Sequence, residues 1–341
     1  MKAFMREDAL KECSPSGIEL IYNKITIREK YIMKGFEYNS GTFIGKGAVE
    51  IFFQTWQTPR PRGVVVVVHG MGEHSGRYHN LVKSLEGTEI NICSFDLRGH
   101  GKSGGKRGHI WSFRDYLADL EIFLDLIGSD FNKIPLLLLG HSLGGLICTT
   151  YVLTRPEKIS GLIASSPFLI LSMKVPSWKS SLGRILSSFA PSITMPTGLN
   201  PADLSHDNDE VESYENDPLV HDRASARWFT EVTAAQADCI NHAQELTLPL
   251  LVIHGKGDKI ADYSGSAVLA ERAASKIKEI HVFEGLYHET MNETFKERAM
   301  VLDIVKTWIL KTCSKKSPSE KKIKAGDSRK KKSAVKKSSK K

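Results

Sequence analysis

The most informative segment of the chain reads LLLLGHSLGGLICTTYVLTRPE and covers residues 136–157. Its four leucines are typical of a strand buried on both faces, and the apolar residues from position 146 onward are typical of a helix. Between them, Gly140 to Gly144 match the pattern GxSxG, which places a serine on a sharp turn from strand to helix. Ser142 is therefore the candidate nucleophile, which a neighbouring base would activate by removing its proton.

Short apolar runs recur on both sides of this segment and alternate with helical patterns. This alternation predicts an α/β fold with a mostly parallel central sheet and helices on both faces. Apolar side chains at helical spacing predict core helices within 113–127 and 301–309. Two antiparallel strands are expected at 41–45 and 49–57, and further strands at 63–70, 91–99, 134–140, 159–167, 248–255 and 277–285.

An acid and a base should follow the serine in the order Ser, Asp, His. Asp258 comes directly after the predicted strand 248–255, and His288 comes directly after the predicted strand 277–285. Adjacent parallel strands would bring both loops to the edge where the serine lies, and the carboxylate would then hold the imidazole in the tautomer that accepts the serine proton. The alternative acid is Asp262, which lies beyond the first turn of its loop.

Other histidines fit structural roles. His254 and His281 lie within predicted strands and are expected to be packed or hydrogen-bonded core residues.

Two backbone amides are expected to stabilise the negative charge that forms on an attacked carbonyl oxygen. The first belongs to Leu143, directly after the serine. The second belongs to Met71, in the glycine-rich loop after the predicted strand 63–70.

Two further patterns lack the spacing that a cofactor or metal requires. The segment DLRGHGKS at 96–103 ends like a phosphate-binding loop, but Asp96 replaces its first glycine. His69, Glu73 and His74 do not have the spacing of a helical zinc motif. We therefore expect no cofactor and no metal.

Residues 171–229 interrupt the alternation of strands and helices, and we call them the cap segment. An insertion at this point would lie above the carboxyl ends of the strands, where open α/β sheets bind ligands. One helical face in this segment is apolar, and it either packs on the body of the protein or contacts lipid and admits an acyl chain. That face comprises Trp178, Leu182, Ile185, Leu186 and Phe189.

The predicted domain organisation has four parts. Residues 36–170 and 230–313 form the α/β core around the cap segment, and residues 1–35 form an N-terminal extension to which no role is assigned. Residues 314–341 contain 12 Lys and one Arg against two acidic residues, so this segment carries +11 of a total charge of +8 and the remainder carries −3. The basic segment has no apolar period and is expected to be a disordered tail.

This basic tail either extends into solvent or is attracted to anionic lipid or nucleic acid. It has no aromatic residues to stack on bases, which argues against sequence-specific recognition of nucleic acid.

The remaining composition favours a soluble, cytoplasmic protein. Any membrane contact is expected to be peripheral, through the cap and the tail. The first residues lack the apolar core of a signal peptide, and no run approaches the ~20 apolar residues that span a bilayer. The five cysteines show no CxxC pair and are expected to be reduced.

Several motifs together resemble the monoacylglycerol lipase and lysophospholipase family of α/β-hydrolases. The resemblance covers roughly residues 36–310. It rests on HGMGEHSGRY (69–78), FDLRGHGKSGGKRGH (95–109), GHSLGG (140–145), NDPLV (216–220), LPLLVIHGKGDKIAD (248–262) and FEGLYHE (283–289).

The resemblance implies a serine hydrolase that cleaves one fatty-acyl ester, with a cap over a hydrophobic tunnel and a lipid ester as substrate. It places the catalytic roles on Ser142, Asp258 and His288, and the two amides on Met71 and Leu143.

The resemblance also implies contacts to the glycerol end of the substrate from Glu73, Arg77 and Tyr214. Without it, Glu73 and Arg77 would be interpreted as a surface ion pair. A further family contact, a histidine three residues after the catalytic one, is replaced here by Met291.

Two alternatives to this function remain open. A short-chain carboxylesterase, an acyltransferase or a peptidase would use the same triad. A non-catalytic binding module with a basic tail would not need the triad.

Overall fold

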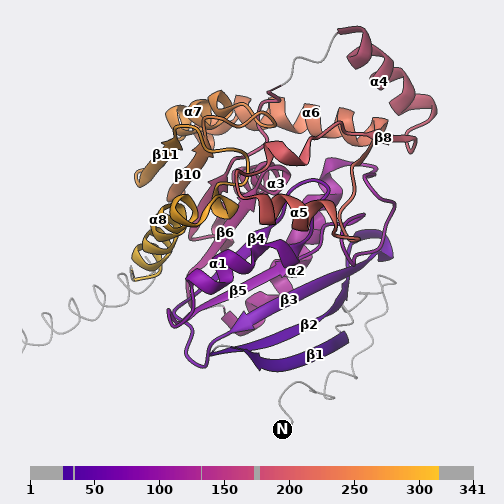
Figure 1. Ribbon diagram of the computed structural model, residues 1–341. Coiled ribbons are helices and arrows are strands. Elements are labelled where there is room, and N and C mark those ends of the chain that lie inside the picture. The colour runs from indigo at the N-terminus through magenta and orange to yellow at the C-terminus, as the bar shows by residue number, and fades with distance from the viewer. Residues whose placement is uncertain (1–25, 34, 132, 173–176, 315–341) are drawn as a thin grey trace, which may run out of the picture.

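The structure is a computed structural model that describes residues 26–314, except residues 34, 132 and 173–176. Within these residues, one large sheet has the strand order β1-β2-β3-β5-β4-β6-β7-β10-β11 (Figure 1). Its strands are β1 (Thr26–Met33), β2 (Phe36–Ile44), β3 (Glu50–Gln57), β4 (Gly63–Val68), β5 (Ile90–Phe95), β6 (Leu136–His141), β7 (Gly161–Ser165), β10 (Leu250–Gly255) and β11 (Lys278–Phe283).

The sheet combines an antiparallel edge with a parallel centre. β1, β2, β3 and β5 pair antiparallel in succession. From β5 onward, all neighbours pair parallel: β5 with β4, β4 with β6, β6 with β7, β7 with β10, and β10 with β11. The five valines of β4 are fully buried, as expected for a central strand covered on both faces.

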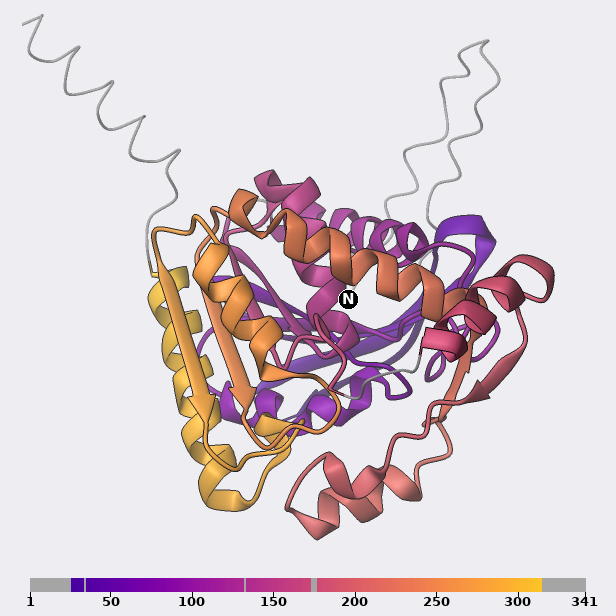
Figure 2. The ribbon, with the colours of Figure 1, turned by 90° about the horizontal axis from the view of Figure 1, so that it is seen from above.

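Helices cover both faces of the sheet (Figure 2). α1 (His79–Ser84) and α8 (Phe295–Cys313) pack on one face, where Val65 and Val67 of β4 join the buried cluster that contains Trp308. On the other face, Val64, Val66 and Val68 join a cluster formed with four helices. These are α2 (Phe113–Phe131), α3 (Leu143–Thr154), α6 (Ala226–Asn241) and α7 (Tyr263–Arg272).

The cap segment forms small elements of its own between β7 and α6. α4 extends away from the sheet, and β8 and β9 pair antiparallel in a separate two-stranded sheet (Figure 1). The elements are α4 (Ser177–Phe189), β8 (Thr194–Pro196), α5 (Asn208–Glu215) and β9 (Arg223–Ser225). Short 3-10 helices complete the chain at Lys46–Ala48, Ser75–Tyr78, Pro156–Lys158, Pro201–Asp203, Ala243–Glu245 and Thr290–Asn292.

The strands and helices expected from the sequence are all present, with three differences. β1 lies within residues 1–35, to which no element was assigned, and it extends the antiparallel edge of the sheet. The short pair β8–β9 was missed because three-residue strands carry no period. α6 begins at Ala226, inside the range expected for the cap segment.

Some predictions fall outside the described residues. These are the disordered tail beyond Ser314, the part of the N-terminal extension that precedes β1, and the state of Cys13. The other four cysteines are free and buried. Among the described residues, no helix is long and apolar enough to cross a membrane.

Close backbone contacts explain the glycines around Ser142. A Cβ atom on Gly144 would collide with the carbonyl oxygen of Val68, and a Cβ atom on Gly140 would collide with the carbonyl oxygen of Gly144. The start of α3 therefore lies directly against the end of β4. Only glycine permits this approach, which brings the serine turn beside the loop that follows β4.

We predict that Gly144→Ala destabilises the fold, because the backbone of β4 cannot move away without disrupting the central sheet. The expected loss is about 1–3 kcal/mol in the free energy of unfolding, measured by urea denaturation. The matched control is Gly128→Ala in α2, where an added Cβ meets open space. This control should stabilise the protein by about 0.5–1 kcal/mol. Equal effects of the two substitutions would contradict the role of the contact.

Candidate active site

Ser142 lies on the turn between β6 and α3 in a strained backbone conformation. Its φ of 52° and ψ of −117° are unusual for a residue other than glycine. Two hydrogen bonds hold the turn: the Ser142 amide donates to the Ser165 carbonyl at 3.0 Å, and the Phe168 amide donates to the Ser142 carbonyl at 2.9 Å. This is the geometry of a serine presented at the top of a sheet.

Asp258 and His288 lie in the loops after the neighbouring strands β10 and β11, and they are directly bonded. The Nδ1–H of His288 donates to Oδ2 of Asp258 at 2.6 Å, and both side chains are buried. Burial opposes a positive charge on His288, but the Asp258 carboxylate outweighs it and raises the pKa of the imidazole above its ordinary value of 6.5. Burial likewise opposes the charge of Asp258, yet the two adjacent histidines, His288 and His254, hold its pKa well below the usual range.

Ser142 and His288 are neighbours through His141. The ring centroids of His141 and His288 are 4.8 Å apart, which places the His288 ring next to the residue that precedes Ser142. The Ser142 hydroxyl does not hydrogen-bond to the His288 ring, whose partner is Asp258. Such bonds are often long without substrate and tighten when it binds. Burial lowers the pKa of His141 to about 3, so this ring is neutral beside His288.

The other candidates have separate positions. Asp262 caps α7 by accepting a hydrogen bond from the Ser264 amide at 2.9 Å. His254 is a hydrogen-bonded core residue, as expected. His281 was expected in the core as well, but this is wrong: β11 is an edge strand, and 37% of the His281 side chain is exposed.

The loop after β4 passes beside Ser142. A Cβ atom built on Gly70 would be 3.1 Å from the Cβ of Ser142, and Met71 follows directly. The Gly70 amide donates to Oε1 of Glu73 at 2.6 Å, which fixes the path of the loop. Leu143 is the first residue of α3, so its amide is one of the N–H groups that have no partner within the helix.

Glu73 and Arg77 form a buried cluster, and the expectation of a surface ion pair is wrong. The Arg77 guanidinium lies 2.6 Å from Glu289 and 3.4 Å from Glu73, and all three side chains are at most 6% exposed. Burial raises the pKa of Glu73, whereas Arg77 lies closest to Glu289 and holds its pKa down despite burial. Glu289 was not identified from the sequence, although its position directly after His288 could have drawn attention to it.

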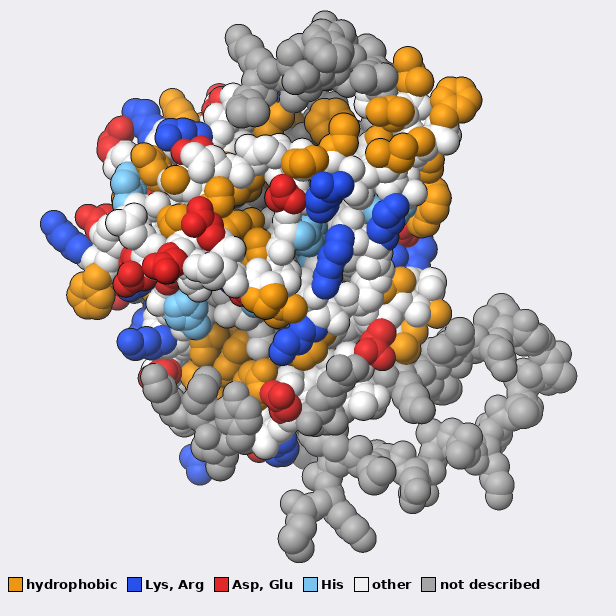
Figure 3. All heavy atoms as spheres, turned by 45° about the vertical axis from the view of Figure 1, so that its right-hand side comes forward, with side chains coloured by type: hydrophobic (Ala, Val, Ile, Leu, Met, Phe, Trp, Pro, Cys, Tyr) orange, Lys and Arg blue, Asp and Glu red, His pale blue; other side chains and the backbone are white. Residues whose placement is uncertain are grey.

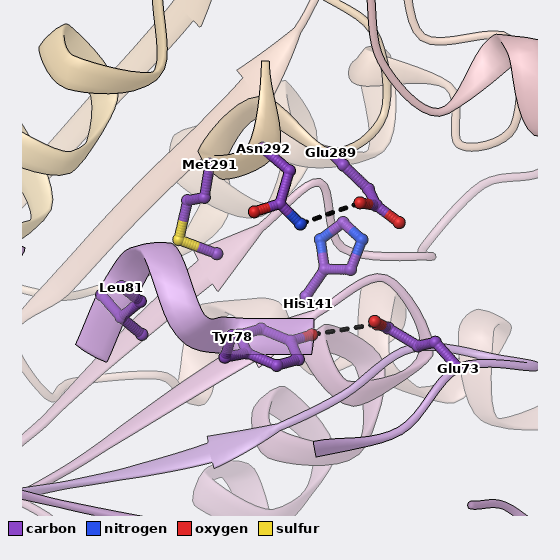
Figure 4. A pocket seen from close by; sticks show the side chains of 7 residues that line it. All are labelled: Glu73, Tyr78, Leu81, His141, Glu289, Met291 and Asn292. Carbon is purple, nitrogen blue, oxygen red and sulfur yellow. Dashed lines mark hydrogen bonds between the residues drawn. The ribbon is translucent and has the colours of Figure 1, made fainter. Parts of the chain in front are cut away.

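A small pocket lined by both polar and apolar side chains lies between this cluster and His141 (Figure 4). Tyr78 donates to Glu73 at 3.0 Å on one side, and Asn292 donates to Glu289 at 2.9 Å on the other. The pocket volume is about 10 Å³, near the lower limit for one water molecule. It is therefore too small for an acyl chain. Met291, which replaces the expected histidine, contributes an apolar side chain to its wall.

Tyr214 of α5 covers Arg77 from the cap segment. The guanidinium carbon lies 4.7 Å from the centre of the Tyr214 ring, an arrangement that favours a cation–π attraction. The Tyr214 hydroxyl lies beside Gly72, 3.4 Å from the position that a Cβ atom would take there. Of the three residues expected at the glycerol end, Arg77 therefore contacts both Glu73 and Tyr214.

Backbone hydrogen bonds join the cap segment to the loops on both sides of the site. The His221 amide donates to the Gly72 carbonyl at 2.9 Å, next to Met71. The Glu289 amide donates to the Leu204 carbonyl at 2.8 Å, next to His288. Part of the cap segment thus lies directly over the candidate active site.

A mostly parallel sheet, helices on both faces and a serine on the turn after a central strand define the α/β-hydrolase fold. Comparison with known proteins supports the assignment of the α/β-hydrolase fold. A family model described as serine aminopeptidase, S33, matches residues 59–295. The chain belongs to this family of α/β-hydrolases.

Individual relatives are similar over most of their length. A monoacylglycerol lipase from Mycolicibacterium smegmatis is 34% identical over 272 residues, which cover 79% of this chain and 96% of that protein. The phospholipase YtpA from Bacillus subtilis is 34% identical over 245 residues, covering 71% and 94%. The crystal structure of a Paleococcus ferrophilus monoacylglycerol lipase has a TM-score of 0.71 and 37% identity, covering 77% of this chain and 99% of that one.

We predict that Asp258→Asn lowers the pKa of His288, because burial then opposes its charge without the strongest compensating carboxylate. The expected result is a decrease of the His288 pKa from its raised wild-type position, measured by NMR titration of the imidazole. The control is Asp262→Asn, which removes only the cap of α7 and should leave the titration unchanged. An unaltered His288 titration in Asp258→Asn would show that the carboxylate does not control the ring.

Proposed function

We propose that this carboxylic-ester hydrolase cleaves a fatty-acyl ester of a monoacylglycerol or lysophospholipid. In this proposal Ser142 is the nucleophile, His288 the general base and Asp258 the acid that orients it. The observation that carries it is the 2.6 Å bond between His288 and Asp258, buried beside the strained serine turn. The named relatives support the substrate class, because they include monoacylglycerol lipases and a phospholipase.

The proposed reaction has two steps. Ser142 Oγ attacks the acyl carbonyl carbon while its proton passes to Nε2 of His288, and the amides of Met71 and Leu143 stabilise the oxyanion. His288 then gives the proton to the leaving alcohol oxygen as the ester bond breaks. In the second step His288 takes a proton from water, whose oxygen attacks the acyl-enzyme. Ser142 recovers its proton and the fatty acid leaves.

Within this proposal, Tyr214 contacts the head group of the substrate. Glu73 and Arg77 are positioning residues that hold the surrounding side chains in place. Both oxygens of Glu73 already face donors, since the Gly70 amide and Tyr78 approach Oε1 and Arg77 approaches Oε2. The Tyr214 ring lies over Arg77 and its hydroxyl lies beside Gly72, where it could donate to a substrate oxygen.

A second candidate function follows from the family description, which names an aminopeptidase. The same triad would cleave an amide by the same steps, with an amine as the leaving group. A peptidase of this kind also needs to bind the free α-amino group of its substrate. Hydrolysis of an aminopeptidase substrate in the panel below would favour this candidate.

We predict that Ser142→Ala abolishes ester hydrolysis and labelling by a fluorophosphonate probe, because both require attack by the Ser142 hydroxyl. The wild-type protein should hydrolyse a long-chain monoacylglycerol or a lysophospholipid faster than a short p-nitrophenyl ester or an aminopeptidase substrate. The control is Ser166→Ala, which removes a buried hydroxyl from the loop after β7. Undiminished labelling of Ser142→Ala would refute the assignment.

We further propose peripheral contact with anionic membranes through the cap segment. Hydrophobic side chains gather at the upper right of the face shown in Figure 3. In the cap segment the exposed fractions are 86% for Phe189 and 56% for Ile185. Lys106 and Arg223 lie at the base of this surface, where they donate to the Ser192 and Thr194 carbonyls. Exposed apolar side chains beside cations suit a surface that contains anionic lipid.

We predict that Phe189→Ser combined with Ile185→Ser weakens binding to phosphatidylserine vesicles, measured by co-sedimentation, because the apolar insertion is lost. The matched control is Phe295→Ser, which alters a residue that is 80% exposed at the start of α8. This control should bind vesicles like the wild type. Equal binding by all three proteins would exclude the cap segment as the contact surface.

A further inference from the structure

Asp258 has a second histidine partner besides His288. His254 is the fifth residue of β10, and its side chain is fully buried. Its Nε2 lies 3.1 Å from Oδ2 of Asp258 and 3.1 Å from the carbonyl oxygen of Ala261. Its Nδ1 lies 2.7 Å from Oγ of Ser266, which is buried in α7.

These partners determine where the His254 ring carries its hydrogen. The two groups beside Nε2 are a carboxylate and a carbonyl, and both can only accept. Nε2 therefore bears the hydrogen and donates it. The partner of Nδ1 is a hydroxyl, which can donate. A singly protonated ring that donates from Nε2 and accepts from Ser266 at Nδ1 satisfies every contact.

The carboxylate of Asp258 is then fully hydrogen-bonded. Its Oδ1 accepts from the amides of Ile260 at 2.8 Å and Ala261 at 2.9 Å. Its Oδ2 accepts from His288 at 2.6 Å and from His254 at 3.1 Å. Four donors match the roughly four lone-pair positions of a carboxylate. Without His254, the oxygen that faces His288 would lose its second donor at a position where the Asp258 side chain is fully buried.

We propose that His254, itself oriented by Ser266, is a positioning residue that fixes the Asp258 carboxylate for its bond to His288. This inference rests on the proposed function, in which Asp258 orients the catalytic base. The order of contacts is Ser266, His254, Asp258, His288, and it continues to the serine turn. The hydrogen-bond partners of His254 are Ser266, Asp258 and Ala261, and Asp258 is the one that contacts His288, so we expect His254 to act through Asp258.

The test compares His254→Leu with His254→Gln. Leucine fills a similar volume without a donor, whereas the glutamine amide can donate to Asp258 in place of Nε2. For His254→Leu we expect kcat for a soluble ester to fall about 10–100-fold, with KM within about twofold of the wild type. His254→Gln should recover most of the lost kcat.

The pH profile provides a readout that a purely structural role would not change. Removing one donor leaves Asp258 more basic, so it holds a proton on His288 more strongly. The base is active only when neutral. The acid limb of kcat/KM should therefore move to higher pH in His254→Leu and return toward the wild-type position in His254→Gln.

The matched control is His109→Leu. His109 is also buried and its Nδ1 also contacts a serine hydroxyl, that of Ser225 at 2.9 Å, but it does not touch Asp258. We expect it to lower the melting temperature and leave the acid limb in place. Two outcomes would overturn the proposal. One is a wild-type kcat and a wild-type acid limb in His254→Leu, and the other is an equal shift of the acid limb in both leucine variants.

Ser266→Ala gives an independent test if His254→Leu does not fold, because it removes a single hydroxyl. We expect a several-fold decrease in kcat, unchanged KM and an acid limb that moves in the same direction. Wild-type values for this variant would refute the contribution of Ser266. The proposed function is judged separately: its failure would appear as esterase activity that survives Ser142→Ala, whatever His254 does.

Discussion

Parallel pairing of apolar strands is the constraint on which the rest of this structure depends. β4, β6, β7 and β10 are buried on both faces, so polar groups cannot lie along them without a partner, and the polar side chains of the site gather where the strands end. The shared strand direction brings those ends to one edge of the sheet. The serine turn meets the Asp258 loop and the His288 loop there, although Ser142 precedes both by more than 100 residues along the chain.

Two buried groups of charges stabilise this edge in different ways. Around Arg77, two carboxylates flank one guanidinium, and the cluster keeps the loop after β4 next to the residue that follows His288. Around Asp258, a single carboxylate is satisfied by two backbone amides and two imidazoles. The first arrangement joins separate loops through ion pairs. The second holds one side chain in one orientation, and this is what a group that must orient a base requires.

The sequence predicted the fold class and most elements because the strands are unbroken β-branched or leucine runs and the helices have clear apolar stripes. It also predicted that Asp258 and His288 would meet, since both follow strands that the α/β pattern makes neighbours. It could not reveal that Glu73 and Arg77 are buried, because their burial depends on Glu289, which is 212 residues from Arg77. The sequence also could not reveal that His254 donates to Asp258, because a histidine inside a strand carries no local signal of its hydrogen-bond partner. The three-residue strands of the cap segment are too short to show a period. β1 has eight residues, but the consecutive charged residues 28–30 interrupt the alternation of apolar and polar side chains.

The two backbone bonds between the cap segment and the catalytic loops have a mechanical consequence. His221 is tied to the loop that carries Met71, and Leu204 is tied to the loop that carries His288. If residues 204–221 moved as a rigid body, both hydrogen bonds would break or both loops would move with them. α4 lies outside this stretch, so a rearrangement around α4 would leave both hydrogen bonds in place.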